Sequence, residues 1–600
     1  MWAVMNNDAP LAHNQNGSKP EPAEPAKISF YARHSTRIRR WLPFLLIGSV
    51  LGYLILVPLI LLVVASFKPE GLILDPGFTF KNFVEIYTGG DFLPLLGATL
   101  VFALGATGTA LFFGISLAWL VERTDLPLRG LVRALIILPM ATPPVLLAIG
   151  WTMLLSPRIG LFNEILKAVF GLSQAPFNIF SFPGMIFIEG LSLTPSTFLI
   201  LSPTFRNMDP NLEEAAITSG ASSWMVIRRV IVPLVSPAIL AAAAFLLIVC
   251  FVVFDIPGTL GLPVGIYTFS SRIYYLAEHS EVGLPLYGQI AALAMFFLAI
   301  LFILGFVYQR LTRHGQRFIT ITGRGYRARP FRLHRLRYPA IGFVALYFFL
   351  GVLAPLSILL WESLMPYQTR VSLEALPLLT LKNHLDFLSN QSVFQAATNS
   401  VTIALVSATA VAMLAMLVAW VVVRSKSVGR RVIDLLSFVP VAIPGVLSGV
   451  ALCYVYLTLK FIPIYGTIWI IAVSYITYYS SYGSRTMRGV MMQMHPELEE
   501  AGRTSGASWL FLMRRITMPL IAPGMIAVWV WVVAHAMREL SAALMLQGMD
   551  NPVVSTLLWE YWSGGEPNKA AAVGVWLMAA LVIVVTLWHF SARLNKMRYQ

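Results

Sequence analysis

The sequence predicts an all-α polytopic membrane protein with about 12 transmembrane helices, arranged as two parallel six-helix repeats. Three observations support this fold class: the composition, the number of long apolar runs, and a long repeat. Of the 600 residues, 57% are hydrophobic and only 12% are charged, with a mean hydropathy of +0.74. Charged residues make up roughly a quarter of an average soluble domain, so this composition excludes a soluble globule.

Twelve apolar runs are long enough to cross a hydrocarbon layer of about 30 Å. They lie near residues 41–66, 95–121, 131–155, 184–204, 234–256, 286–308, 338–361, 395–423, 432–458, 464–482, 522–546 and 569–590. The first run is too long for the core of a signal peptide, so we expect it to remain as a membrane helix. A cytoplasmic N-terminus places most of the 43 Lys and Arg on the inner side. We therefore expect a multi-pass membrane protein with both termini in the cytoplasm.

These runs divide the chain into two halves with three flanking segments. The expected division is a disordered tail (1–40), a first half (41–308) with a polar loop at 206–233, a linker (309–337), a second half (338–590) with a polar loop at 485–519, and a C-terminal tail (591–600). The linker holds nine Arg and no acid. It is either a lipid- or nucleic-acid-binding patch or a retention signal that contacts anionic headgroups, and we favour the second.

The repeat is clearest in the two polar loops. Residues 210–237 are PNLEEAAITSGASSWMVIRRVIVPLVSP, and residues 496–523 are PELEEAGRTSGASWLFLMRRITMPLIAP. An offset of 286 superposes them without a gap. Gly220 and Gly506 can take the positive φ that ends one helical piece, and a serine two residues later suits the N-cap of the next. We expect Pro233 and Pro519 to end or kink the second piece.

The repeat extends beyond the loops, but with a different offset. A shift of 301 places Ala118 and Trp119 on Ala419 and Trp420. The first half therefore carries 15 extra residues, which we assign to the outer loop between Ser156 and Pro183, where the amphipathic stretch LFNEILKAVFGL is suited to the membrane surface. Because each half has an even number of spans, the two halves are parallel repeats.

The duplicated loops resemble the EAA loop of binding-protein-dependent ABC importer permeases, in which an acid, small residues, a glycine and a hydrophobic-Pro-Leu segment recur at fixed spacing. Gly502 replaces the second alanine of the motif, which we expect to loosen that helix. The resemblance implies a type I, methionine-importer-like permease fold and a role for the loops in coupling to the ATPase. The implied coupling residues are Glu213, Glu214, Ala215, Gly220, Arg228 and Arg229 in the first loop and Glu499, Glu500, Ala501, Gly506, Arg514 and Arg515 in the second.

Ionisable residues in or beside predicted spans include Glu189, Asp255, His535, Arg538 and Glu539. An uncompensated charge at the middle of a membrane costs at least about 2.5 kcal/mol, so such residues are functional candidates. We take Asp255, Arg538 and Glu539 as candidates for the translocation path. A purely structural role, with Arg538 and Glu539 compensating each other, remains open.

The chain lacks the motifs of an enzyme. It contains no GxxxxGK[ST] phosphate loop and no HExxH, CxxC or GxSxG pattern, so ATP hydrolysis is expected in a separate chain. Both cysteines, Cys250 and Cys453, lie within apolar runs, which argues against a disulfide framework or a metal site. We expect no cofactor, no metal and no nucleic acid. The resemblance implies two ATPase subunits and a periplasmic or lipid-anchored solute-binding protein as partners, within a lipid bilayer.

The solute is the least defined part of this interpretation. The fusion of two halves and the segment 254–274, FDIPGTLGLPVGIYTFSSRIY, resemble the permeases of ferric-iron importers. Thiamine, polyamines and phosphonate are alternatives that would use the same machinery. An ion-coupled secondary transporter also favours two parallel six-span halves, but it would not need the duplicated loops.

Overall fold

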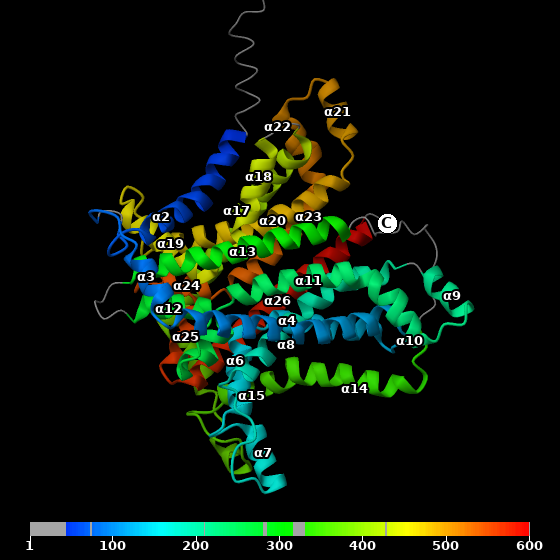
Figure 1. Ribbon diagram of the computed structural model, residues 1–600, viewed down its shortest axis with the longest axis vertical. Coiled ribbons are helices and arrows are strands. Elements are labelled where there is room, and N and C mark those ends of the chain that lie inside the picture. The colour runs from blue at the N-terminus through cyan, green and yellow to red at the C-terminus, as the bar shows by residue number, and fades with distance from the viewer. Residues whose placement is uncertain are drawn as a thin grey trace, which may run out of the picture.

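The computed structural model describes residues 44–72, 75–208, 210–279, 285–315, 331–425 and 429–598 (Figure 1). These ranges are predominantly helical, and the one β-bridge within them joins Thr124 to Phe331. The predicted N-terminal tail, residues 316–330 of the predicted linker and the last two residues lie outside the described residues.

The helices of the first half end at the linker. They are α2 (Val57–Ser66), α3 (Lys81–Thr88), α4 (Phe92–Arg123), α5 (Arg129–Ile137), α6 (Pro144–Leu155), α7 (Leu161–Phe170), α8 (Phe182–Arg206), α9 (Pro210–Thr218), α10 (Ser223–Val226), α11 (Val232–Val252), α12 (Phe269–Glu278) and α13 (Tyr287–Gly315).

The helices of the second half repeat most of this order; α7 has no equivalent, and α24 takes the place of the π-helical turn Pro257–Gly261. They are α14 (Arg337–Phe348), α15 (Ala354–Ser363), α16 (Lys382–Ser389), α17 (Gln391–Arg424), α18 (Gly429–Phe438), α19 (Gly445–Thr458), α20 (Ile468–Gln493), α21 (Glu497–Thr504), α22 (Trp509–Leu512), α23 (Met518–Ala536), α24 (Ser541–Leu546), α25 (Val554–Ser563) and α26 (Pro567–Arg598).

The predicted membrane helices are present among the described residues, although two of them are broken. Nine helices are long and apolar enough to cross a membrane, and two bent pairs raise that number to 11. The more polar α20, with 26 residues, occupies the position of the remaining predicted span. The bent pairs are α5 with α6, at 95°, and α18 with α19, at 110°. Prolines at 139, 143, 440 and 444 lie at these bends, where a missing N–H and a fixed φ interrupt the helix.

The expectation that Pro233 and Pro519 end a helix or kink it is corrected in one respect. The helix continues past each proline, because a five-residue π-helical turn precedes it: Ile227–Ile231 in the first half and Met513–Thr517 in the second. Proline clashes with the carbonyl four residues earlier in an α-helix, and the wider π turn removes that clash. The helical piece that follows each glycine hinge is thus continuous with a membrane helix.

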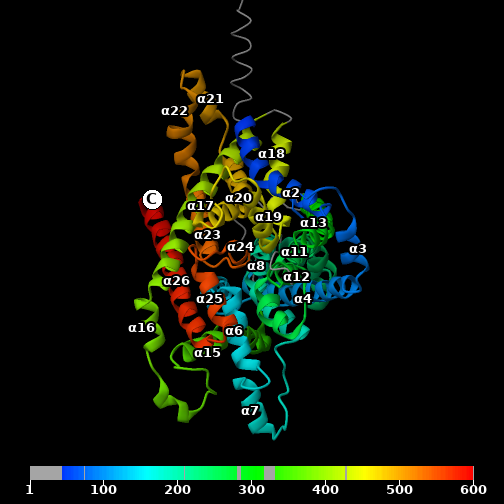
Figure 2. The same cartoon turned by 90° about the vertical axis from the view of Figure 1, so that its left-hand side faces the viewer.

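The two halves interlock through their first membrane helices. In Figure 2, α2 of the first half lies beside α19 of the second, and α15 of the second half lies beside α6 of the first. Tyr53, just before α2, shares a 2.9 Å hydrogen bond with Tyr456 of α19. A Cβ added to Gly150 of α6 would lie 2.9 Å from the Pro355 carbonyl oxygen of α15. One hydrophobic core therefore extends across both halves.

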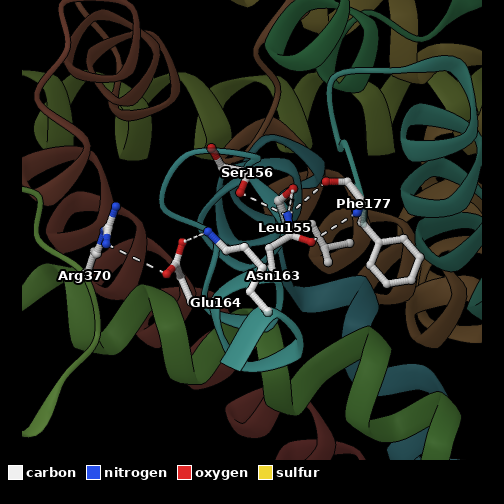
Figure 3. Close-up of polar contacts among 7 residues, drawn as sticks. Leu155, Ser156, Asn163, Glu164, Phe177 and Arg370 are labelled. Carbon is white, nitrogen blue, oxygen red and sulfur yellow. Dashed lines mark hydrogen bonds and ion pairs between the residues drawn. The ribbon is translucent and has the colours of Figure 1, made fainter. Parts of the chain in front are cut away.

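The 15 extra residues of the first half build a packed lobe, with α7 projecting from the body of the molecule (Figure 1). The buried Asn163 amide donates to the carbonyls of Leu155, Ser156 and Phe177 at 2.9 to 3.1 Å (Figure 3). Glu164 pairs with Lys167 in the lobe and with Arg370 of the second half at 3.8 Å. The amphipathic stretch is therefore a helix anchored to both halves.

The last residues of the predicted linker are packed on the first half. The Phe331 N–H donates to the Arg123 carbonyl at 2.8 Å, and the Asp125 N–H donates back to Phe331 at 3.1 Å. The Leu333 N–H donates to the Asp125 carboxylate at 2.8 Å, and its side chain is buried. Residues 331–333 of the predicted linker are therefore packed against the first half.

Candidate functional site

The two coupling segments, α9–α10 and α21–α22, have the same backbone geometry. Gly220 has φ of 84° and Gly506 has φ of 80°. In each segment the N–H of the residue after the glycine donates to a carbonyl five residues earlier, from Ala221 to Ala216 at 3.0 Å and from Ala507 to Gly502 at 3.1 Å. This is the Schellman arrangement that ends a helix at a left-handed glycine. The glycine hinges predicted from the sequence are present.

A serine hydroxyl caps the second helix of each segment, as expected. Ser222 Oγ accepts from the Met225 N–H at 3.4 Å, and Ser508 Oγ accepts from the Phe511 N–H at 3.3 Å. Figure 1 shows α9 and α21 at the periphery of the molecule, away from α7.

Gly502 does not leave the second segment loose. A Cβ at this position would lie 2.3 Å from Leu512 Cδ2 and 3.1 Å from Ile516 Cδ1. The equivalent positions in the first segment hold Ala216 and the smaller Val226. The larger Leu512 side chain on α22 therefore fills the space that an alanine methyl group at position 502 of α21 would occupy. The expectation that Gly502 loosens the helix is wrong, because this packing holds the segment together.

The two acids of each pair face different environments. Glu214 and Glu500 are exposed, whereas Glu213 is half-buried and Glu499 is buried. Glu213 pairs with Arg123 at the end of α4, and Glu499 pairs with Arg424 at the end of α17 at 3.3 Å. Arg424 also donates to the Met494 carbonyl at 2.8 Å. The first acid of each pair anchors its segment to a long membrane helix, whereas the second acid is exposed at the surface.

Arg123 and Arg424 hold the first acid of each pair, and the sequence reasoning missed both. They are equivalent under the offset of 301 and follow the matched Ala118–Trp119 and Ala419–Trp420 pairs by a few residues. That offset is the signal that could have found them. Burial raises the pKa of the Glu213 carboxyl above its usual range, and the Arg123 guanidinium acts in the opposite direction.

The exposed face of each coupling segment combines charge with apolar side chains. Of the sequence-predicted residues, Ala215, Gly220, Arg228 and Arg229 are exposed with Glu214, and Ala501, Gly506, Arg514 and Arg515 are exposed with Glu500. Large exposed apolar residues occur at three equivalent positions: Leu212 and Leu498, Trp224 and Leu510, Met225 and Phe511. Trp224 and Leu510 are 69% and 68% exposed. A duplicated exposed apolar face with charges around it is typical of a protein interface.

The candidate path residues lie where the two helices that follow the coupling segments break. α11 ends at Val252, just before Asp255, and α23 ends at Ala536, just before Arg538 and Glu539. Phe254, next to Asp255, packs on Trp559 of α25 with the ring centres 5.5 Å apart, and Ser555 of α25 donates to the Glu539 carbonyl at 2.6 Å. Both breaks therefore lie against α25, and we call Asp255, Arg538 and Glu539 the central polar cluster.

Two residues of this central polar cluster, Glu539 and Arg538, also have structural contacts. The Glu539 carboxylate accepts from the Ala542 N–H at 3.0 Å and the Ala543 N–H at 3.3 Å, at the start of α24. Arg538 donates to the Met140 carbonyl, at the bend between α5 and α6. Arg538 thus joins the second half to the first, and the structural and transport roles are not exclusive.

Glu189 is a further ionisable residue that was predicted within a span. Its side chain is buried, and Oε2 has no hydrogen-bond partner among the described residues. The offset of 286 places Glu189 on Tyr475, whose hydroxyl donates to the Glu539 carbonyl at 3.1 Å. Within the described residues no group of three or more His, Cys, Asp or Glu is arranged to hold a metal ion.

The chain resembles known transport proteins along most of its length. It is 26% identical to the putative ferric transport system permease protein FbpB 1 of Haemophilus influenzae over 74% of this chain and 68% of that protein. It is 24% identical to the ferric transport system permease protein FbpB of Actinobacillus pleuropneumoniae over 86% of this chain and 73% of that protein. It is 30% identical to the sulfate transport system permease protein CysW of Escherichia coli over 36% of this chain and 70% of that protein.

One family matches the chain twice, once in each half. The family described as "Binding-protein-dependent transport system inner membrane component" matches residues 110–315 and 411–593. Each match contains one coupling segment and the helix break that follows it. The predicted fusion of two permease halves is confirmed, and a permease subunit is not itself an enzyme. The chain belongs to the family of binding-protein-dependent transport system inner membrane components.

Proposed function

We propose that this chain forms the solute pathway of an ATP-driven importer of ferric iron, with one ATPase subunit docked on each coupling segment. The observation that carries the coupling role is the duplicated exposed face, with Glu214 and Glu500 turned outward beside equivalent apolar residues. Two identical partners require two equivalent surfaces, and the chain provides them. The anchors at Arg123 and Arg424 would transmit a movement of the ATPases to α4 and α17.

The orientation follows from this proposal. The coupling segments would face the cytoplasm together with both termini, and the α7 lobe would face the periplasm. A periplasmic or lipid-anchored binding protein would then deliver the solute to the side that carries α7. Asp255, Arg538 and Glu539 would lie along the route between the two faces.

Ferric iron is supported by the two ferric permeases that align with most of this chain. Selection of the solute would fall mainly to the binding protein. An oxyanion is the second candidate solute, because the sulfate permease is 30% identical to 36% of this chain.

The test is uptake of labelled ferric iron in a strain lacking the gene, complemented with the wild-type chain or with a Glu214→Ala, Glu500→Ala double variant. We expect iron uptake only with the wild type, at equal membrane abundance. Unchanged iron uptake in the deletion strain, together with lost uptake of sulfate, thiamine, a polyamine or phosphonate, would reassign the solute. ATPase activity of the homogeneous chain without a second subunit would refute the separate motor.

A further inference from the structure

A cavity of about 730 Å³ lies between the two halves. Tyr308 of α13 lines it from the first half. From the second half it is lined by Arg431, Asp434 and Phe438 of α18 and by Arg485 and Arg488 of α20. Since α13 leads into the linker and α20 leads into α21, the cavity lies toward the helix ends that carry the second coupling segment. It is separate from the central polar cluster.

The walls of this cavity carry more positive than negative charge. Arg488 Nη1 donates to both carboxylate oxygens of Asp434 at 2.8 Å, so these two charges balance. Arg431 and Arg485 form no ion pair with any residue that the structure describes. Asp434 is the one acid among the lining residues, so the cavity wall carries an excess of positive charge that favours an anion.

Arg485 is held in place by an aromatic ring. Its guanidinium carbon lies 4.0 Å from the centre of the Phe438 ring. Phe438 in turn packs on the first half, where a Cβ at Gly305 of α13 would lie 3.4 Å from the ring. A guanidinium stacked by its face keeps its N–H groups available at the edge, which suits two-point binding of a phosphate. The cavity also has apolar lining from Leu435 and Met492.

We propose that this cavity binds the phosphate group of an acidic phospholipid, with Arg431 and Arg485 as its ligands. Apolar walls next to two uncompensated arginines match a headgroup joined to acyl chains, and basic pockets between membrane helices bind such headgroups. Because α13 and α18–α20 belong to different halves, the bound lipid would join the halves at this end. The proposal does not depend on the solute, and its test measures lipid binding, not transport.

The test uses the full chain purified in detergent, with co-purified phospholipid measured by native mass spectrometry. The Arg431→Gln, Arg485→Gln double variant is compared with an Arg158→Gln, Lys460→Gln control, which removes the same charge from exposed positions outside both the cavity and the linker. We expect the wild type and the control to retain an acidic phospholipid and the cavity variant to lose it at least fivefold. Returning phosphatidylglycerol, but not phosphatidylcholine, should raise the Tm of the wild type and of the control, but not that of the cavity variant.

Two outcomes would overturn the assignment. Equal lipid retention by the cavity variant and the wild type would show that the arginines are not ligands. Stabilisation of the wild type by inorganic phosphate, with the same arginine dependence but without retained lipid, would assign the site to a soluble phosphate compound instead. An Arg431→Lys, Arg485→Lys variant keeps the charge and separates loss of binding from failure to fold.

Discussion

The two coupling segments agree down to single hydrogen bonds, whereas the two helix breaks at the centre of the molecule do not. Both segments share the left-handed glycine, the serine cap and the arginine anchor. At the breaks, Glu539 is equivalent to Val253, and Tyr475 is equivalent to Glu189. If the segments dock two copies of one partner, as proposed, their surfaces must stay alike, whereas a pathway that meets one solute at a time has no such constraint. The comparison thus distinguishes a symmetric pair of surface segments from an asymmetric pair of helix breaks.

The strongest test of the symmetric segments is their hinge. Gly220→Val or Gly506→Val should abolish uptake or reduce it about tenfold or more, because the left-handed backbone costs an L-residue about 1–2 kcal/mol and a β-branched residue more. A Cβ meets nothing within 4 Å at either position, so backbone strain is the only local cause. Uptake is measured at equal membrane abundance. Gly→Asn variants, which tolerate this conformation better, should retain more activity, and full activity in both valine variants would contradict the role.

The anchoring pairs should give the next largest effect. Arg123→Ala leaves Glu213 without its partner and should release α9 from α4, lowering both stability and uptake several-fold. Breaking a fully buried pair costs about 3–5 kcal/mol, and the cost here is smaller because Glu213 is 19% exposed. Glu214→Gln is the matched comparison. We expect it to leave the Tm unchanged while lowering ATPase stimulation, and equal effects of Glu213→Gln and Glu214→Gln on the Tm would contradict two separate roles.

Dividing the halves should have a moderate effect. The gene is cut near Gly323, outside the described residues, and the second fragment receives its own start codon. Co-expressed fragments should retain measurable uptake, because α2 and α15 interlock the halves and Phe331 stays with the second fragment. A tether mainly raises effective concentration. Either fragment alone should give none, and associated fragments without uptake would show that the linker does more than tether.

The smallest effect sharpens the comparison between the two segments. Gly502→Ala should destabilise the chain by about 1–3 kcal/mol, since the added methyl meets the Leu512 side chain. The double variant Gly502→Ala, Leu512→Val recreates the pair found in the first segment and should recover most of the loss. Thermal unfolding of the three proteins measures this. No recovery in the double variant would show that the two segments pack differently.

The sequence by itself determined the features that depend on local chemistry and on repetition. Glycines at 220 and 506 end helices because only glycine takes positive φ without cost, and apolar run length limits the number of spans. The offset of 286 located both coupling segments before any contact was known. Family membership followed from the same residues.

Only the tertiary structure decided which of two adjacent acids anchors a segment, how far the apolar runs bend, and where the extra 15 residues pack. Glu213 and Glu214 are the same residue type in the same helix, and only the position of Arg123, 90 residues away, distinguishes them. The prolines at 139 and 440 indicate that the helix is interrupted, but they do not determine the bend angle of 95° or 110°. Contacts between distant segments leave no local pattern, because their free energy depends on partners that the chain brings together only when it folds.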